Sequence, residues 1–446
     1  MPEVNNTTVS IVVPVYNGAA ELARCLGALR KSTVVPLEII VVDDGSTDDS
    51  RSVAEGSGAI VLATGGRSGP ARARNLGARA AQGDVLFFLD ADVVAQSDAV
   101  GRVQRAFQEN AKLDALIGSY DDDPAERDFL SQYKNLMHCF VHQTGHDQAS
   151  TFWSGCGAIR RDVFLAHSGF DERYDRPAIE DIELGYRLFQ AGRHMMLDKG
   201  LRVKHLKRWT FWNLLKTDVL DRGIPWTELI LRDRNMPNDL NLQVSQRISV
   251  ALAFLSVGFA LVMTVYWKGY FLTPLFALLL LVMGRFWLDS DGAPQGPKAF
   301  LAMTVGFAIL VGAAWYHHMM GIIPPVILGY VLLFLRHRYA FDVDHKRQVS
   351  SLLMLLYSAL SILFILTYLP GNALLSAFVV LLLTLVVLNN QFYLFLAARR
   401  GKAFALAAVP FHLLYHFYNG ISFGAGLLRY SWRNLTRRGN ATAPEK

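Results

Sequence analysis

The sequence predicts an α/β domain over residues 1–208 and an all-α, multi-span transmembrane domain over residues 246–446. In the first part, short apolar runs alternate with helical patterns, which is typical of βαβ units and a parallel sheet. In the second part, the apolar runs approach the ~17–25 residues that cross a bilayer as a helix. Charge divides in the same way, because residues 1–245 hold 28 basic and 33 acidic residues, whereas residues 246–446 hold 16 and 5.

The first domain is predicted to begin with a strand at Val9–Val15, because this run is continuously apolar and β-branched, as in a strand covered on both faces. Helical spacing of apolar residues and further short apolar runs predict the other elements. The other predicted strands are Leu37–Val42, Ala59–Ala63, Val85–Leu89 and Ala115–Tyr120. The predicted helices are Glu21–Lys31, Thr47–Glu55, Pro70–Ala81, Ala99–Asn110, Phe129–Phe140 and Ile182–Gln190.

The second domain is predicted to cross the membrane six times, with a further segment, Phe404–Leu428, that either spans or re-enters. With the N-terminus in the cytoplasm, the basic loops between the spans fall on the cytoplasmic side, as the positive-inside rule expects. The N-terminus also lacks the basic n-region of a signal peptide. We therefore expect an integral protein of the bacterial inner (cytoplasmic) membrane with a cytoplasmic first domain. The six predicted spans are Ser249–Trp267, Tyr270–Leu288, Phe300–Tyr316, Ile322–Leu335, Leu352–Leu369 and Ala373–Ala398.

Residues 209–245 are predicted to form amphipathic helices that lie on the membrane surface. Over Trp209–Met236, aromatic and aliphatic side chains alternate with Lys, Arg and Asp, as in interfacial helices. An ordinary domain surface is the alternative.

Charge and cysteine content argue against nucleic-acid binding and against cysteine-based structural sites. The net charge of +6 resides in short loops between apolar runs, so it does not indicate nucleic-acid binding. Cys25, Cys139 and Cys156 lack the CxxC spacing, so neither a disulfide framework nor a cysteine zinc site is expected.

Acidic residues follow two of the predicted strands, where an open parallel sheet binds its ligands. Asp90 and Asp92 come directly after Val85–Leu89, and on extended backbone that spacing points both carboxylates the same way. Mg²⁺ or Mn²⁺ binds through few carboxylates together with substrate oxygens, so this pair predicts a metal site. Asp44 comes at the end of the predicted strand Leu37–Val42 and could accept a hydrogen bond from a nucleotide base, although an Asx turn or a helix cap is also compatible.

Further candidates lie later in the chain. Glu180-Asp181 could supply a general base, which contributes typically ~10²–10⁴-fold to a rate. Acidic residues also suit the start of the helix predicted there, and both roles can hold. His205 could contact the metal, although a lone histidine is more often structural. Arg72 and Arg74 could reach a phosphate or a base.

Six short motifs occur in order along the first half of the chain. They are Ser10-Ile-Val-Val-Pro-Val-Tyr-Asn17, Val42-Asp-Asp-Gly-Ser-Thr-Asp48, Ala73-Arg-Asn75, Leu89-Asp-Ala-Asp92, Gly169-Phe-Asp-Glu172 and Glu180-Asp181. This combination closely resembles family 2 of the inverting glycosyltransferases. The resemblance implies a GT-A (Rossmann-like) fold that binds a nucleotide sugar, usually a UDP-sugar.

The same resemblance implies roles for individual residues. The nucleotide would be bound by Pro14, Tyr16, Asn17, Asp44, Arg74 and Asp90. The metal, Mg²⁺ or Mn²⁺, would be bound by Asp92 with Asp90, and His205 is the further candidate ligand. Asp181 would be the catalytic base, with Glu180 beside it. Trp153, Gly155 and Gly157 match the stretch that lines the acceptor side.

Two departures from the family pattern narrow the function. Processive synthases carry a Gln-x-x-Arg-Trp motif, and the stretch His205-Leu-Lys-Arg-Trp209 keeps only its last two residues. Those synthases also have spans before the catalytic domain, and we expect none here. Both differences disfavour polymer extrusion. Polyprenyl-phosphate sugar synthases have an ionised acceptor that needs no base, so Glu180-Asp181 favours a hydroxyl acceptor.

We predict an inverting, metal-dependent hexosyltransferase that transfers one sugar from a nucleotide sugar to a lipid or lipid-linked hydroxyl at the cytoplasmic membrane face. The alternatives are a processive polysaccharide synthase, a polyprenyl-phosphate sugar synthase and a non-catalytic scaffold that binds sugar nucleotides.

Overall fold

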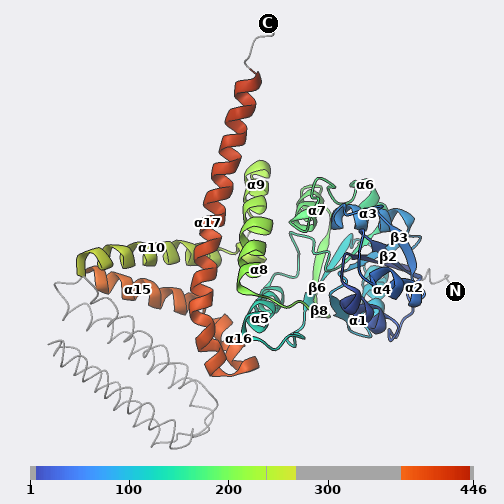
Figure 1. Cartoon of the computed structure of the whole chain (residues 1–446), viewed down its shortest axis with the longest axis horizontal. Helices are drawn as coiled ribbons and strands as arrows, with labels where there is room; N and C mark the ends of the chain where they lie inside the picture. Colours follow the sequence, from blue (N-terminus) through green and yellow to red (C-terminus); the bar gives the residue numbers. More distant parts are fainter. Residues whose placement is uncertain (1–6, 238, 268–372, 442–446) are drawn as a thin grey trace, which may run out of the picture. The chain divides into compact units, whose positions relative to one another are not determined.

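The computed structural model describes residues 7–237, 239–267 and 373–441 (Figure 1). The chain forms two compact units, one of Met1–Arg247 with Tyr418–Lys446 and the other of Ile248–Phe417. Four predicted spans lie outside the described residues, namely Tyr270–Leu288, Phe300–Tyr316, Ile322–Leu335 and Leu352–Leu369.

The first unit is built on an eight-stranded sheet with the strand order β3-β2-β1-β4-β7-β6-β8-β5. Strands β3, β2, β1 and β4 are parallel, as predicted. Strand β7 is antiparallel to β4 and β6, and β5 is antiparallel to β8. Strand β6 is parallel to β8. The sheet is therefore mixed, and the prediction of a parallel sheet is wrong at β7 and β5. The strands are β1 Val9–Val15, β2 Glu38–Asp43, β3 Ile60–Ala63, β4 Val85–Leu89, β5 Val93–Ala95, β6 Ala115–Tyr120, β7 Cys156–Arg160 and β8 Met195–His205.

Seven helices of the first unit precede or join these strands (Figure 1). Helices α2 and α3 pack on the parallel strands, whereas α1 contacts α2 and β5, and α4 contacts β8 and β1. Their apolar spacing buries one face, as Leu22, Cys25 and Leu29 do in α1. All six predicted helices are present with shifted ends; α6 was not predicted. The helices are α1 Ala19–Leu29, α2 Ser50–Gly56, α3 Pro70–Ala80, α4 Ala99–Glu109, α5 Phe129–Thr144, α6 Arg161–Ala166 and α7 Glu180–Gln190.

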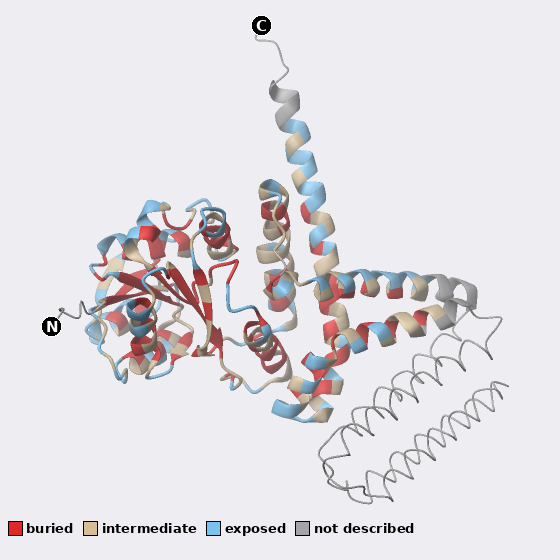
Figure 2. Ribbon diagram, turned by 180° about the vertical axis from the view of Figure 1, so that it is seen from behind, coloured by how far each residue is buried: buried red, intermediate tan, exposed pale blue. Residues whose placement is uncertain are grey.

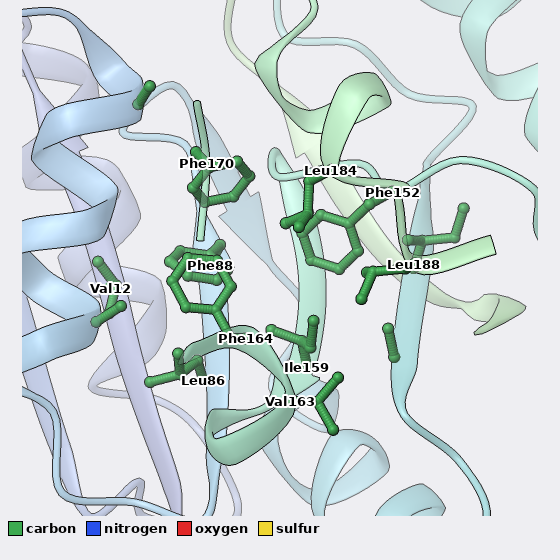
Figure 3. Packing of buried hydrophobic residues seen from close by; sticks show 14 of the residues in the cluster. Val12, Leu86, Phe88, Phe152, Ile159, Val163, Phe164, Phe170, Leu184 and Leu188 are labelled. Atoms are coloured by element: carbon green, nitrogen blue, oxygen red, sulfur yellow. The ribbon is translucent and has the colours of Figure 1, made fainter. Parts of the chain in front are cut away.

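The core between the sheet and its helices is apolar and aromatic, and the central strands are buried (Figure 2). Phe88 of β4 lies between Phe164 and Phe170, with ring centroids 5.2 Å away in each case (Figure 3). Helix α3 approaches the sheet closely at Gly77, where an added Cβ would lie 2.5 Å from a Val12 methyl and 3.0 Å from a Val42 methyl. This packing fixes α3, and with it the arginine that organises the site described below.

Residues 209–245 form the short helices α8 Phe211–Leu215, η1 Lys216–Gly223, α9 Ile224–Asp233 and η2 Leu240–Leu242. Of these, η1 is a π-helix. The apolar side chains of this segment differ in exposure: Trp212 is 77% exposed, whereas Leu229 and Ile230 are buried. Trp226 donates a hydrogen bond from Nε1 to the Tyr186 hydroxyl over 3.0 Å. The segment is amphipathic, and its position on a membrane stays a prediction.

The C-terminal end of helix α17, Lys402–Ala441, belongs to the first unit and packs against η1 and α9. Asp218 of η1 is buried between the Lys134 ammonium, 2.6 and 2.8 Å from its two carboxylate oxygens, and the Tyr418 hydroxyl at 2.6 Å. Arg429 and Arg433 each reach Glu228 over 3.2 Å. Helices α5, η1, α9 and α17 are thereby joined by charge pairs.

The described part of the second unit contains α10 Val244–Trp267 from its fifth residue on, α15 Ala373–Leu388, α16 Asn390–Arg400 and the first part of α17. Within the described residues, Val244–Leu261 is one stretch long and apolar enough to cross a membrane. The predicted single span Ala373–Ala398 is instead two helices, and Val380–Leu388 and Asn390–Arg400 meet at 61°. The bend falls at Asn389, whose amide donates to the Ser249 hydroxyl and the Leu385 carbonyl. The six-span arrangement stays a prediction.

Candidate active site

Arg74 joins the end of β4 to the start of α7. It lies on α3, is 5% exposed, and places its two terminal nitrogens 2.6 Å from Asp90 Oδ1 and 2.9 Å from Glu180 Oε1. Although burial opposes its charge, Asp90 and Glu180 hold the pKa of Arg74 above its usual range. The second Glu180 oxygen accepts from the backbone N–H of Ala178 over 2.9 Å. Both oxygens of Glu180 are therefore committed to holding this corner of the fold.

Asp181 is the neighbouring carboxylate, and it is arranged differently. Its Oδ2 accepts from the backbone N–H of Ser154 at 3.1 Å and from the Ser154 hydroxyl at 3.2 Å, and its Oδ1 accepts from the backbone N–H of Ile182. Burial, followed by the negative charge of Glu180, raises the pKa of Asp181 to about 6. A carboxylate that ionises near neutral pH is suited to accept a proton.

Asp92 and His205 face each other at the far end of the sheet. Asp90 to Val93 form a turn closed by a hydrogen bond from the Val93 N–H to the Asp90 carbonyl, and Val93 pairs with His205 across β5 and β8. His205 Nε2 lies 3.5 Å from Asp92 Oδ2. Asp90 contacts Arg74 and Asp92 contacts His205, so the two carboxylates have different partners, and their joint role in binding a metal stays a prediction.

The Asp92–His205 pair fits a divalent cation that takes most of its ligands from a substrate. Among the described residues no group of three or more His, Cys, Asp or Glu side chains could hold a metal ion. Mg²⁺ and Mn²⁺ do not need such a cage, since they bind through one or two protein ligands together with phosphate oxygens and water. The separation of 3.5 Å is longer than the ~2.7–2.9 Å of a charge-assisted hydrogen bond.

Asp44 lies outside this cluster and holds a loop. Its carboxylate accepts from the backbone N–H groups of Ser68 and Gly69 at 2.9 and 2.8 Å and from the Thr64 hydroxyl at 2.9 Å. The loop leads directly into α3, which begins at Pro70 and carries Arg74. Asp44 thus supports the position of Arg74, and its contact with a nucleotide stays a prediction.

The three residues at the end of β1 form the edge nearest this loop. Tyr16 is 40% exposed, and the Arg67 guanidinium lies 4.5 Å from its ring centroid. Asn17 has a positive φ of 50° and accepts from the backbone N–H of Thr47 over 2.7 Å. Pro14 is half-buried beside β2. An exposed aromatic ring beside a guanidinium is a surface on which a nucleobase can stack, and these roles stay predictions.

Trp153, Gly155 and Gly157 form one packing unit beside Asp181. A Cβ at Gly155 would lie 2.7 Å from the Trp153 indole nitrogen, and one at Gly157 would lie 2.3 Å from the Trp153 carbonyl oxygen. The Trp153 ring meets Tyr120 edge-on with centroids 4.6 Å apart. Both glycines are therefore required by the close approach of Trp153, whose contact with an acceptor stays a prediction.

The structure places six of the predicted residues in three contact groups. Arg74 contacts Asp90 and Glu180, Ser154 contacts Asp181, and His205 contacts Asp92. The groups are joined through the chain, since Glu180 precedes Asp181 and Asp90 lies two residues before Asp92. The sequence prediction missed Ser154, Tyr120 and Lys207. Burial lowers the pKa of Lys207, and the charges of Asp92 and Asp90 oppose that shift, so its ammonium lies near the cation site. Ser154 lies between the predicted Trp153 and Gly155, and Lys207 lies within His205–Trp209, so their places in these motifs are the sequence signal that could have identified them.

The sequence is similar to known glycosyltransferases over its first half. Residues 10–167 match the family described as "Glycosyl transferase family 2". A validoxylamine A glucosyltransferase of Streptomyces hygroscopicus subsp. limoneus is 31% identical over 44% of this chain and 51% of its own length. The O-antigen chain rhamnosyltransferase RfbN of Salmonella typhimurium is 26% identical over 49% of this chain and 74% of its own length.

Coverage limits what these similarities show. The first curated relatives are matched over between 33% and 60% of their own lengths. Among solved structures, a mannosyltransferase of Pyrobaculum calidifontis in complex with GDP-Man and Mn²⁺ is 15% identical over 86% of this chain and 89% of its own, with a TM-score of 0.37. At that score nothing about this chain follows from the likeness.

Proposed function

Because the chain carries a glycosyltransferase family 2 domain, we propose that it transfers a single sugar, with inversion, from a nucleotide sugar to a hydroxyl of a lipid or lipid-linked acceptor. The donor is a UDP-sugar, and the transfer takes place at the cytoplasmic face of the membrane. The observation that carries the proposal is the arrangement around Arg74. Arg74 pairs with Glu180, the neighbour of the base candidate Asp181, and with Asp90, two residues before the Asp92 that faces His205.

Asp181 is the general base in this proposal. As the acceptor oxygen bonds to the anomeric carbon, Asp181 accepts the hydroxyl proton, and the bond from that carbon to the diphosphate oxygen breaks on the opposite face. Ser154 orients the Asp181 carboxylate through two hydrogen bonds. The pKa of Asp181, about 6, leaves that carboxylate ionised at neutral pH. Glu180 pairs with the Arg74 guanidinium through one oxygen and accepts from the Ala178 N–H through the other, so its role in this proposal is to hold Arg74.

Asp92 and His205 hold Mg²⁺ or Mn²⁺ in this proposal, with Asp90 nearby on Arg74. When bound, the cation supplies Lewis-acid stabilisation of the departing diphosphate. Lys207 adds a positive charge on the same side, which suits the same anion. The apolar helix Val244–Leu261 and the exposed Trp212 support attachment to a bilayer, where a lipid acceptor is found at high local concentration.

The proposal is tested with the full-length protein in lipid nanodiscs. It is incubated with a panel of nucleotide sugars, Mg²⁺ or Mn²⁺ and a bacterial lipid extract, and the lipids are analysed by mass spectrometry. We expect one lipid class to gain the mass of one sugar, and Asp181→Asn to abolish the gain. Asp147→Asn is the matched control, since Asp147 is 76% exposed and pairs only with Lys199 among the described residues.

Other outcomes separate the alternatives. A long polymer would replace the proposal with a processive synthase. A sugar attached to a polyprenyl phosphate, with Asp181→Asn still active, would replace it with a polyprenyl-phosphate sugar synthase. Binding of a nucleotide sugar without any transfer would leave a scaffold.

A further inference from the structure

The side chain of Asn135 connects helix α5 to the end of β8. It is 1% exposed, and its Oδ1 lies 2.7 Å from His205 Nδ1 and 3.1 Å from Trp209 Nε1. An indole nitrogen can only donate, so the Asn135 atom that meets Trp209 must be the carbonyl oxygen. The amide nitrogen points away, toward the Lys207 carbonyl at 3.5 Å. The contact with Trp209 therefore determines the orientation of the Asn135 amide independently of its contact with His205.

This orientation fixes the tautomer of His205. An imidazole nitrogen 2.7 Å from a carbonyl oxygen must carry its proton, so Nδ1 of His205 is protonated. In the neutral ring the lone pair then resides on Nε2. The ring plane is also fixed, because Tyr120 stacks on it with centroids 4.4 Å apart and an interplanar angle of 21°.

The free edge of the ring points to the cation site. Nε2 lies 3.5 Å from Asp92 Oδ2 and 3.5 Å from the Tyr120 hydroxyl, and both distances exceed a good hydrogen bond. A lone pair held beside a carboxylate is repelled by it unless a proton or a metal cation lies between them. The geometry thus gives His205 a hydrogen-bonded side, at Asn135, and a ligand side, at Asp92.

We infer that Asn135 is a positioning residue for the divalent cation: its carbonyl holds His205 as the Nδ1–H tautomer, so that Nε2 and Asp92 are both available as ligands. The inference rests on the proposed function, because the cation is part of it. Partners of this kind orient metal-binding histidines, and their loss typically lowers metal affinity about 10–100-fold.

The test measures Mn²⁺ binding by the full-length protein in nanodiscs, by the electron paramagnetic resonance signal of free Mn²⁺, with and without UDP. Asn135→Leu keeps the volume and removes the acceptor, so we expect Mn²⁺ affinity to fall about 10–100-fold. Asn135→Asp still accepts from both donors, so we expect its affinity to stay within a few-fold of the unmodified protein. Gln143→Leu is the matched control, because Gln143 also projects an amide from α5 but bonds to Ser119 and Lys199.

Thermal unfolding of each variant separates binding from folding. A folded Asn135→Leu that binds Mn²⁺ as tightly as the unmodified protein overturns the inference. If Asn135→Leu does not fold, Asn135→Asp decides: retained affinity supports the inference, and a loss of more than about tenfold overturns it. An unmodified protein that transfers sugar without binding Mn²⁺ or Mg²⁺ would instead contradict the metal in the proposed function.

Discussion

Ionisation of Asp181 is expected to set the acid limb of the pH profile for sugar transfer. Its pKa of about 6 means that about one carboxyl in ten is ionised at pH 5 and about nine in ten at pH 7. Only the ionised form accepts a proton from the acceptor. We therefore expect kcat/KM to fall about tenfold from pH 7 to pH 5 and to be flat above pH 7 on this limb.

Replacing Asp181 with Asn removes the base and keeps the size and shape of the side chain. General-base catalysis is worth ~10²–10⁴-fold, so the variant should lose about 3–5 kcal/mol of transition-state stabilisation. Initial rates with a radiolabelled sugar donor measure this, and the acid limb near pH 6 should disappear from the residual activity.

The same substitution has a predictable effect on stability. A folded-state pKa of about 6, raised above the ordinary 3.8, contributes stability that is complete below pH ~4 and is lost as the pH rises through 6. Two units correspond to about 3 kcal/mol. Asn cannot ionise, so Asp181→Asn should gain about 3 kcal/mol relative to the unmodified protein between pH 4 and pH 8.

A hydrogen bond that the Asn amide no longer makes with Ser154 or Ile182 lowers the free energy of unfolding equally at both pH values. The difference between the two pH values therefore does not contain it. Thermal unfolding at pH 4 and pH 8 gives the difference, and Asp147→Asn should show almost none because its carboxylate is exposed. A variant with the same relative stability at both values, together with an unchanged acid limb, would refute the assignment of Asp181 as a buried, ionising base.

Three further substitutions test the framework of the site, each by thermal unfolding of the full-length protein. Arg74→Ala leaves two carboxylates without their counter-charge and should cost about 3–5 kcal/mol; a loss below 1 kcal/mol would show that Glu180 is not held by the pair. Gly157→Ala places a methyl group 2.3 Å from a carbonyl oxygen and should cost about 1–3 kcal/mol, and an unchanged unfolding temperature would contradict that packing. Lys134→Met leaves Asp218 buried without its cation and should also cost about 3–5 kcal/mol, whereas adding Asp218→Leu should recover much of it; no recovery would contradict a pairwise interaction.

The first half of the sheet could be predicted from sequence because each strand there carries its own signal. Val9–Val15 and Val85–Leu89 have the predicted bounds, since each is a short, largely apolar and buried run, as in a strand covered on both faces. Strand β7, Cys156–Arg160, contains a glycine and ends in arginine, and β8 includes Asp198-Lys199-Gly200. Those strands form because neighbouring strands offer partners, which a local pattern cannot show.

The contacts of the candidate site residues could not be predicted from their spacing. Asp90 and Asp92 lie two residues apart, and the turn after β4 gives them different partners, Arg74 and His205. Asp44 was assigned to a ligand, and its oxygens are occupied by the loop before α3. Asn135 lies in a helix without a motif and becomes informative only when His205 and Trp209, 70 and 74 residues later, are found on its carbonyl oxygen.

The π-helix Lys216–Gly223 contains slack in its length. A π-helix closes hydrogen bonds one residue further along than an α-helix, so it accommodates a residue that an α-helix would displace. Deleting one residue there lets the stretch close as an ordinary α-helix, and the helix that follows keeps its register. The same deletion at the start of α9, which is a regular α-helix, would rotate the rest of that helix by about 100°. Trp226 would then leave Tyr186, and Glu228 would leave its two arginines.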